Sequence, residues 1–194
     1  MVSDAHGDSA AAGRIRRAAI EVFAESGYGG SSTRQIAKRL DMSATAMYPH
    51  YRSKEELLYA IALEGHRGLL CALRASDDPA AGFADRLHNV VSAFAAWHAE
   101  NHKQAKVVQY ELHGLTPSHY RTIAPLRRQT TGIIANIVEL GQATGEFDVD
   151  SVEEAVMAIS SLCVDVCRWF PSRRHRDAQA LGEMYARVAK RLVH

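Results

Sequence analysis

Cysteine, proline and long apolar stretches are all scarce in this sequence. Three cysteines among 194 residues do not suggest a disulfide framework, and five prolines leave room for long helices. No segment approaches the roughly 18 uninterrupted apolar residues that a transmembrane helix requires. The N-terminal sequence MVSDAHGDSAAAG also lacks the apolar segment of a signal peptide. These absences favour a reducing, cytoplasmic location and no contact with a membrane.

The overall composition is that of an ordinary globular protein. Hydrophobic residues make up 47% and charged residues 23% of the chain, so wholesale disorder is not expected. A chain of 194 residues can bury a core without disulfides or a structural metal. The formal net charge is only +1. A preference for nucleic acid must therefore come from how the charges are distributed rather than from their sum.

Helical periodicity dominates the chain, and no alternating pattern indicates a β-strand. We therefore predict an all-α fold of nine helices. Side-chain oxygens at the expected helix starts can accept hydrogen bonds from the free N–H groups of the first turn. These N-cap residues are Ser32 or Thr33, Ser43, Ser53 and Ser151. The predicted helices cover residues 14–26, 33–40, 44–50, 54–74, 82–101, 103–113, 119–143, 151–170 and 177–193.

Two short predicted helices near the N-terminus, at 33–40 and 44–50, are joined by Leu40-Asp41-Met42-Ser43. This is the spacing of a helix-turn-helix, in which the second helix enters the major groove of DNA. Charge agrees with this interpretation. Residues 14–54 hold eight Lys and Arg against three acids, whereas the segments on either side each carry a net charge of −2. A positive charge confined to one small module is what phosphate binding requires.

The run SSTRQIAKRLDMSATAMYPHYRSKEELL, at 31–58, closely resembles the signature of TetR-type transcriptional regulators. The segment AAIEVFAESGY at 18–28 resembles the first helix of that family, and TGEFDVD at 144–150 resembles a junction common in it. The resemblance implies a helix-turn-helix DNA-binding domain and a domain for ligand binding and dimerisation. The implied boundaries are a flexible arm at 1–13, the helix-turn-helix domain at 14–58, with its fourth helix continuing to about residue 75, and the second domain at 76–194.

Two positions depart from the family pattern, since Asp41 and Thr45 stand where Gly is usual. Asp can still adopt the left-handed conformation of the turn, while Thr45 changes what reaches the bases. Small side chains let the second helix approach base edges, and the resemblance implies that Tyr48 and His50 contact the DNA backbone, while Lys54 is expected to meet a phosphate. Tyr51 is expected in the core. The predicted DNA-binding residues are Thr33, Arg34, Ser43, Ala44, Thr45, Tyr48, His50 and Lys54.

The last two long helices carry apolar surface suited to pairing. The helix predicted at 151–170 is apolar around most of its circumference, and the one at 177–193 has one apolar stripe on an otherwise basic surface. In regulators of this kind, these two helices pair with a second copy and form a four-helix interface. The predicted interface residues are Val156, Ile159, Cys163, Val166, Leu181, Met184, Tyr185, Val188 and Leu192.

The resemblance also implies a small-molecule cavity in the second domain, lined by aromatic side chains with a few polar groups. Arg168-Trp169-Phe170-Pro171 resembles a helix end in the subset of the family that senses acyl-CoA thioesters in fatty-acid or steroid breakdown. Other positions used by that subset are small or apolar, as at Ser160 and Val164, so CoA is left open. We expect a mostly apolar effector whose anionic end meets Arg168. The predicted lining residues are Phe94, Trp97, His98, Tyr110, Glu111, Arg168 and Trp169.

Catalytic, metal and cofactor sites are not indicated. His98 and His102 have the spacing of a metal pair on a helix, but no third ligand is evident. Cys163 and Cys167 lie in an apolar helix, as core residues do. The leading interpretation is a homodimeric repressor of a palindromic DNA operator. Two alternatives stay open: a helical metal-dependent enzyme, which leaves the basic helix-turn-helix unexplained, and an interaction protein that keeps the fold without binding DNA.

Overall fold

The structure, a computed structural model, describes residues 10–194 and confirms the all-α prediction. This range contains eight α-helices, two short 3-10 helices and no strand. The nine predicted helices are corrected at one place, because the third is a 3-10 segment. The elements are α1 (Ala10–Ser26), α2 (Thr33–Arg39), η1 (Ala44–Met47), α3 (Lys54–Ser76), α4 (Phe83–Glu100), α5 (His102–Glu111), η2 (Leu112–Gly114), α6 (Pro117–Ala143), α7 (Val152–Trp169) and α8 (Ala178–Arg191).

The first helix begins at Ala10 rather than at Arg14, inside the segment expected to be a flexible arm. Alanine is the strongest helix former, and Ala12 packs into the core with the rest of the helix. The expectation of a loose arm is therefore wrong for residues 10–13. Its remaining part, 1–9, lies outside the described residues.

Serine side chains start several helices, as the sequence predicts. Ser32 begins α2 with a reciprocal pair of bonds: its hydroxyl accepts from the Gln35 N–H, and its own N–H donates to the Gln35 side chain at 2.7 Å. Ser43, Ser53 and Ser151 each accept from the N–H of the residue three positions later. Local sequence thus fixes where the helices of both domains begin.

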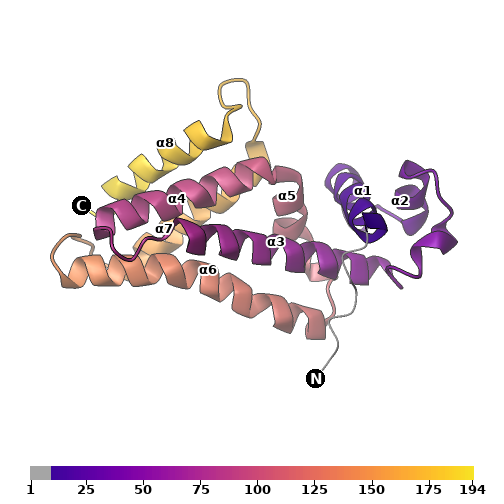
Figure 1. Cartoon of the computed structure of the whole chain (residues 1–194), viewed down its shortest axis with the longest axis horizontal. Coiled ribbons are helices and arrows are strands. Elements are labelled where there is room, and N and C mark those ends of the chain that lie inside the picture. Colours follow the sequence, from indigo (N-terminus) through magenta and orange to yellow (C-terminus); the bar gives the residue numbers. More distant parts are fainter. Residues whose placement is uncertain (1–9) are drawn as a thin grey trace.

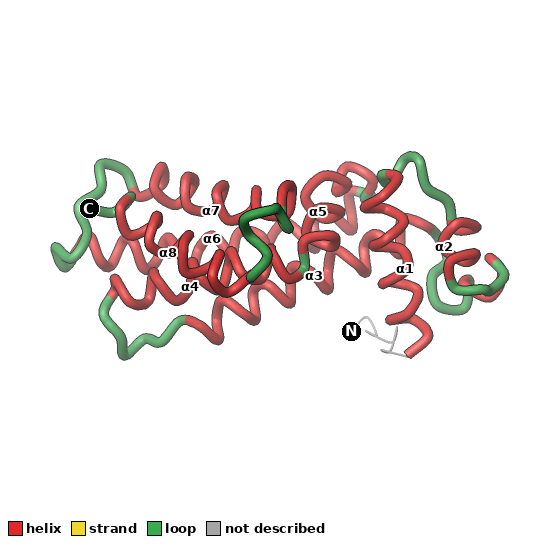
Figure 2. Tube along the Cα trace, turned by 90° about the horizontal axis from the view of Figure 1, so that it is seen from above, coloured by secondary structure: helices red, strands yellow, loops and turns green. Residues whose placement is uncertain are grey.

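Two hydrophobic cores lie towards opposite ends of the molecule, and α3 runs between them (Figure 1). The N-terminal core unites α1, α2, η1 and the first turns of α3, with side chains from α5 and the start of α6. The C-terminal core unites α4, α6, α7, α8 and the last turns of α3. On α3, Leu57 and Ile61 belong to the first core, and Leu69 and Leu73 to the second. Figure 2 shows the second group as an elongated bundle.

The junction between α6 and α7 ties the C-terminal bundle together. Gly145 ends the turn with φ +76°, in the left-handed region that suits glycine. The carboxylate of Glu146 accepts hydrogen bonds from the N–H groups of Phe83 and Ala84, at 3.2 and 2.7 Å. These are free donors at the start of α4, where the N-cap residue Gly82 has no side chain to offer. The TGEFDVD motif therefore has a structural role.

Helix α8 packs closely along α4 through small residues. A Cβ atom placed on Gly182 would lie 2.5 Å from the backbone oxygen of Ser92, so the two helices leave no room for a side chain there. Ala96 on α4 and Ala186 on α8 are also buried along this contact region. With one side occupied by α4, α8 leaves Val188 on its exposed surface.

Helix α6 is the longest element and reaches from one core to the other. It begins at Pro117, where the missing N–H has no cost, and it contains Pro125 in its interior. The N–H that Pro125 lacks would otherwise have bonded the carbonyl of Arg121. Across residues 10–194, none of the helices combines the length and the apolar character needed to cross a membrane.

Candidate functional site

The turn between α2 and η1 has the geometry of a helix-turn-helix. Asp41 adopts φ +53°, the left-handed conformation expected for it. The N–H groups of Leu40 and Met42 both bond the Ala37 carbonyl, at 3.0 and 3.1 Å, and so close the end of α2. The two elements pack against each other across this turn. Asp41 therefore fills the place of the usual Gly.

The second element of this motif is a 3-10 helix because of Pro49. In an α-helix the Thr45 carbonyl would accept from residue 49, but proline has no N–H. It accepts instead from the Tyr48 N–H at 3.3 Å, which is the 3-10 pattern. The chain then continues with the N–H groups of His50 and Tyr51 both on the Met47 carbonyl at 2.9 Å. The prediction of a regular helix over 44–50 is corrected accordingly.

One buried side chain anchors this segment and leaves its outer surface free. Met47 is 2% exposed, whereas Tyr48 is 54% exposed. Tyr51 is buried, as predicted, and its hydroxyl accepts from Arg16 at 2.8 Å. The exposed residues among the predicted DNA contacts are Arg34, Ser43, Thr45 and Tyr48, and the half-buried ones are Thr33, Ala44, His50 and Lys54.

Lys54 is held inside the domain. Its ammonium donates to the carbonyls of Tyr28 and Ser31, at 2.7 and 2.9 Å, and lies 4.2 Å from the centre of the Tyr28 ring. Both carbonyls belong to the loop between α1 and α2. Lys54 therefore fixes the start of α3 to this loop, and only one of its three N–H donors is left for a phosphate.

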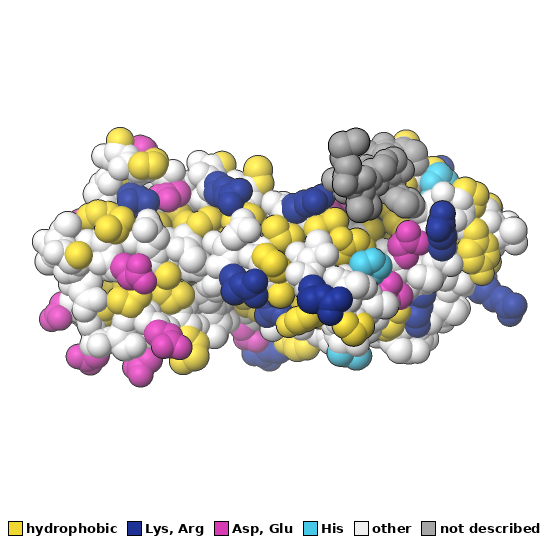
Figure 3. Space-filling model, turned by 90° about the horizontal axis from the view of Figure 1, so that it is seen from below, with side chains coloured by type: hydrophobic (Ala, Val, Ile, Leu, Met, Phe, Trp, Pro, Cys, Tyr) yellow, Lys and Arg dark blue, Asp and Glu magenta, His cyan; other side chains and the backbone are white. Residues whose placement is uncertain are grey.

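The remaining cations of the domain divide into two groups. Arg39 forms two hydrogen bonds of 2.8 Å with Glu25, and Arg16 pairs with Glu64. Among the described residues, Arg34, Lys38 and Arg52 have no side-chain ion pair. Figure 3 shows more acidic side chains towards the opposite end of the molecule, whereas Lys and Arg outnumber Asp and Glu over the rest of this face.

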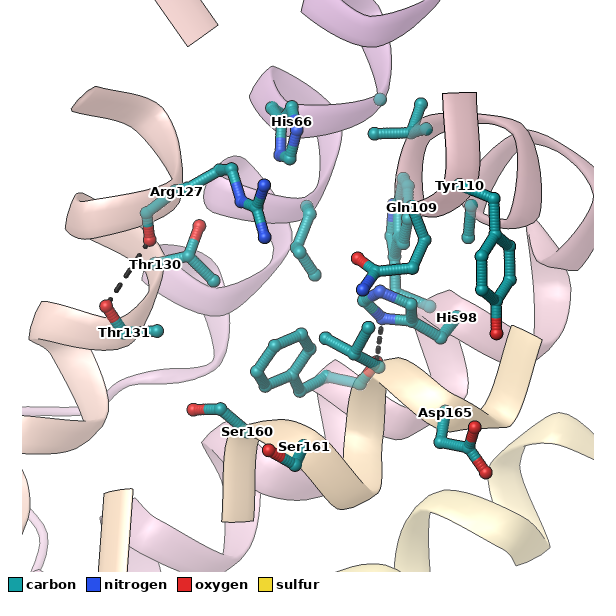
Figure 4. Close-up of a pocket in the computed structure, with 17 residues that line it drawn as sticks. His66, His98, Gln109, Tyr110, Arg127, Thr130, Thr131, Ser160, Ser161 and Asp165 are labelled. Atoms are coloured by element: carbon teal, nitrogen blue, oxygen red, sulfur yellow. Dashed lines mark hydrogen bonds between the residues drawn. The ribbon is translucent and has the colours of Figure 1, made fainter. Parts of the chain in front are cut away.

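A cavity of about 350 Å³ lies in the C-terminal bundle, lined by α3, α4, α5, α6 and α7 and open to solvent on one side (Figure 4). Its apolar wall includes Leu69, Phe94 and Val108. Four of the seven predicted ligand-binding residues line it, namely Phe94, Trp97, His98 and Tyr110. The other polar lining residues are His66, Gln109, Arg127, Thr130, Thr131, Ser160, Ser161 and Asp165.

The other three predicted ligand-binding residues lie outside this lining. Arg168 is one helical turn beyond Asp165, the last α7 residue of the wall, and its exposed guanidinium donates to the Asp165 carboxylate at 2.7 and 2.9 Å. This pairing lowers the pKa of Asp165. Glu111 lies at the end of α5 beside His113, and Trp169 packs its ring against His175. The geometry does not support the expectation that Arg168 receives the anionic end of an effector.

Arg127 on α6 is the cation of this cavity, and the sequence analysis missed it. Its side chain reaches from α6 towards His66 on α3 (Figure 4). No carboxylate pairs with it within residues 10–194. The helical period held a signal, because Arg127 lies on the same side of α6 as the buried Ile123, Thr130 and Ile134, although Arg127 is itself exposed at the edge of the cavity. A cation at the edge of an apolar cavity is a candidate binding group.

The two histidines of the cavity are uncharged at neutral pH. Burial lowers the pKa of His98 to about 4, and its Nδ1 lies 3.1 Å from the Phe94 carbonyl, to which it can donate as a neutral ring. Burial also lowers the pKa of His66 to about 4, with further contributions from Arg127 and His98. The wall therefore combines apolar side chains and neutral hydrogen-bonding groups with one cation, Arg127, and one carboxylate, Asp165, which is paired with Arg168.

The predicted dimer residues separate into buried and accessible sets. Ile159, Cys163 and Val166 on α7 and Leu181 on α8 are buried in the core of their own chain, because both helices pack against α4. They are thus corrected from interface to core, and burial raises the pKa of the Cys163 thiol. The accessible residues of the prediction are Val156, Met184, Tyr185, Val188 and Leu192. Met157 on α7, which is 62% exposed, and Leu162 join them and were not predicted.

Comparison with known proteins gives the family. Residues 15–61 match the model for bacterial regulatory proteins of the tetR family, and residues 80–193 match that for the tetracyclin repressor-like C-terminal domain. A bacterial regulatory protein in the tetR family from Rhodococcus RHA1 is 50% identical, with a TM-score of 0.91 over 95% of this chain and 97% of that one. The HTH-type transcriptional regulator UidR of Escherichia coli K12 is 28% identical over 138 residues, 71% of this chain and 69% of UidR.

A more distant structure shares the fold. The transcriptional regulator FadR from Bacillus subtilis, solved in complex with stearoyl-CoA, is 24% identical, with a TM-score of 0.72 over 93% of this chain and 98% of that one. The two matched models together span the helix-turn-helix and nearly all of the bundle that encloses the cavity. The chain belongs to the TetR family of bacterial transcriptional regulators.

Proposed function

We propose that this protein is a homodimeric transcriptional repressor that binds a palindromic DNA operator and is released from it by a small, mostly apolar effector with an anionic end. The observation that carries the proposal is that α3 connects two sites. Its first turn is fixed through Lys54 to the loop that precedes α2 of the helix-turn-helix, and its middle contributes His66 to the wall of the cavity.

The DNA-binding part of the proposal rests on the exposed surface of α2 and η1. Thr45 and Tyr48 project from a segment anchored by Met47, and small neighbours let it approach base edges. Arg34 and Lys38 on α2 supply charge for phosphates. Thr33, Ser43, Ala44, His50 and Lys54 remain in the proposed contact surface, with Lys54 mainly positioning the loop before α2.

The dimer part rests on apolar side chains that one chain leaves accessible on α7 and α8. Val188 on α8 is 40% exposed, and Met157 on α7 is more exposed still. Two such helices from each copy would bury these side chains in a four-helix contact. Two recognition segments then face two half-sites, which is why the proposed operator is a near-palindrome.

The effector part rests on the cavity. Arg127 takes the role predicted for Arg168, because it is the unpaired cation in the wall. An anionic group would accept bidentate hydrogen bonds from its guanidinium, while the apolar wall would take the carbon skeleton. The fold relative FadR was solved with stearoyl-CoA, which makes acyl compounds and their CoA thioesters the first probes.

The structure offers one physical link between the cavity and the DNA-binding domain. Glu55, in the first turn of α3, accepts from the Thr116 N–H at 2.8 Å and lies 2.8 Å from Nδ1 of His119 on α6. The His119 ring stacks on Tyr59 with 3.9 Å between centroids. Arg127 lies two turns further along α6. A ligand that moves α6 would therefore act on the start of α3.

Operator binding tests the proposal. DNA selected from a random pool by the full-length protein is expected to contain an inverted repeat, and an effector should weaken binding by about 5- to 150-fold, the usual range of allosteric coupling. Val188→Glu should give a folded monomer in sedimentation, because the new carboxylate would be buried unpaired in the dimer, while Arg187→Glu serves as its neighbouring control. Failure to select any DNA sequence would refute the repressor.

The cavity is tested separately with a matched pair of variants. Arg127→Gln should abolish release by decanoate or by stearoyl-CoA at concentrations that release the native protein. Arg128→Gln, the same change on the next residue, which is also exposed but does not line the cavity, should leave release unchanged. Equal responses of the two variants would remove Arg127 from effector binding.

A further inference from the structure

Two buried side-chain atoms of the described residues have no hydrogen-bond partner, and both belong to residues that line the cavity. They are Nε2 of His66 on α3 and Oγ of Ser160 on α7. Buried polar groups in native proteins are paired in the large majority of cases, so each exception needs an explanation. That both exceptions fall in one cavity wall indicates that a bound molecule completes them.

The two atoms come from different sides of the cavity. In Figure 4, His66 lies beside the guanidinium of Arg127, whereas Ser160 lies at the opposite edge. The apolar side chains of Leu69 and Phe94 also line the space. A single polar end on a ligand could reach Arg127 and His66 together, but it would leave Ser160 without a partner.

Both groups are themselves uncharged at neutral pH. Burial, Arg127 and His98 lower the pKa of His66 to about 4, so its ring is neutral and Nε2 donates or accepts according to tautomer. The Ser160 hydroxyl can do either. A second anion near Ser160 is not favoured, because no cation lines the cavity beside it except Arg127. A hydroxyl or a carbonyl oxygen fits the chemistry of this wall.

We infer that the cavity binds a compact carboxylic acid that carries a second, uncharged oxygen, as a hydroxyl or keto group, on its carbon skeleton. The carboxylate accepts from Arg127 and His66, and the second oxygen pairs with Ser160 across the apolar middle. The inference rests on the proposed function for treating this cavity as the effector site, and it narrows the effector class. A volume of about 350 Å³ suits a compact acid, since ligand pockets span about 300–1,000 Å³.

Calorimetric binding to the full-length protein tests the second oxygen. The probes are decanoate, 3-hydroxydecanoate, 6-hydroxydecanoate, 10-hydroxydecanoate and 6-oxodecanoate. At least one oxygenated acid should bind about tenfold more tightly than decanoate, the gain expected from one completed hydrogen bond. This gain should disappear in Ser160→Ala and persist in Ser161→Ala, the same change in the neighbouring lining residue. The inference is overturned if decanoate binds as tightly as every oxygenated acid, or if the gain in affinity persists in Ser160→Ala.

A second measurement needs no ligand. If Ser160 Oγ lacks a partner in the free protein, Ser160→Ala removes no hydrogen bond and should leave the melting temperature equal to or above that of Ser161→Ala. A clearly lower melting temperature would show that the hydroxyl already has a partner and would remove the basis of the inference.

Operator binding, measured in parallel, separates this inference from the proposed function. If an oxygenated acid binds through Ser160 but leaves operator affinity unchanged, the ligand class stands and the effector response fails. If decanoate releases the operator as well as any oxygenated acid does, the repressor stands and the ligand class fails.

Discussion

The two ends of the molecule differ in how completely their polar side chains are hydrogen-bonded. In the DNA-binding domain, Lys54 donates to two carbonyls and Arg39 is paired with Glu25. In the cavity wall, His66 and Ser160 each have a buried atom that nothing within residues 10–194 satisfies. The first region is therefore complete in its internal bonding, and its free groups lie on the surface. The second region keeps polar atoms without hydrogen-bond partners in the wall of the cavity, where a bound ligand can reach them.

The largest loss of stability expected from one substitution at neutral pH comes from the α4–α8 contact, which lies within the C-terminal bundle. Gly182→Ala places a Cβ atom 2.5 Å from the Ser92 carbonyl oxygen, a backbone atom that cannot move away locally. We expect a loss of about 2–3 kcal/mol in the free energy of unfolding, as for overpacked cores. Urea denaturation at fixed protein concentration measures it.

Gly132→Ala is the matched control, because nothing lies within 4 Å of the new methyl group. It should stabilise the protein by about 0.5–1 kcal/mol through helix propensity. If both substitutions behave alike, close packing of α8 on α4 is not what holds the bundle.

Acid should weaken the C-terminal region first. The pKa values of His66 and His98 are about 4 in the folded protein, below the ordinary value of 6.5, so the unfolded chain binds protons more readily. Stability is therefore lost as the pH falls from about 6.5 to about 4, by roughly 3 kcal/mol per histidine. His66→Leu and His98→Leu should each flatten this dependence in urea denaturation.

Hydrogen exchange resolved by segment locates the effect. Protection of α4 and α7 should fall in this pH range before that of α1. His113→Leu, which replaces an exposed histidine outside the cavity lining, is the matched control variant. Unchanged slopes in both buried-histidine variants would contradict their neutral state.

Lys54 distinguishes internal support from contact with DNA. Lys54→Met should lower the stability of the DNA-binding domain by about 1–2 kcal/mol, because two loop carbonyls lose a charged donor. Arg34→Ala should leave stability unchanged and reduce the slope of log affinity against log salt by about one. Anisotropy titrations with operator DNA over a salt series measure the affinity of both variants and its salt dependence. A full unit of lost slope in Lys54→Met would place its ammonium on a phosphate in the complex.

The smallest expected effect concerns the contact between α3 and α6. Burial raises the pKa of Glu55, but hydrogen bonds from Thr116 and His119 outweigh it and lower the pKa below its usual 4.5. A lowered carboxyl pKa contributes stability that is present above about pH 4.5 and is lost as the pH falls further. Glu55→Gln should remove this low-pH component, measured as the slope of stability between pH 5 and about pH 3. It should also weaken the effector response if α6 acts on α3 here.

The sequence was sufficient for the DNA-binding domain because its signals are local. Serine N-caps and the tolerance of Asp41 for a left-handed turn act within a few residues, and both appear where predicted. The exception is also local: Pro49 deprives Thr45 of its α-helical partner, and the segment becomes 3-10. This consequence could have been inferred from the sequence.

The cavity could be predicted only in part, because its lining depends on how five helices are rotated against one another. The aromatic residues of α4 were correctly predicted to line the cavity because they are aromatic and face inward. The cation was not, because Arg168 lies one turn beyond the wall and Arg127 lines it. Likewise, α7 is apolar around most of its circumference, and its sequence does not show which part the chain itself covers and which part a second copy covers. Ile159 and Val166 are covered by the chain itself.

Pro125 marks the place in α6 where the helix bends most easily. The carbonyl of Arg121 has no α-helical N–H to hold it, so resistance to bending is lowest between the turn that contacts α3 and the turns that line the cavity. The shorter arm of the helix carries His119 and inserts Ile123 into the N-terminal core, while the longer arm carries Arg127. Such a helix passes on a shift along its axis better than it passes on a rotation. A ligand that moves Arg127 along the axis of α6 would therefore act on Glu55. Small sideways movements of Arg127, which accommodate ligands of different shape, would instead be taken up by bending of α6 at Pro125.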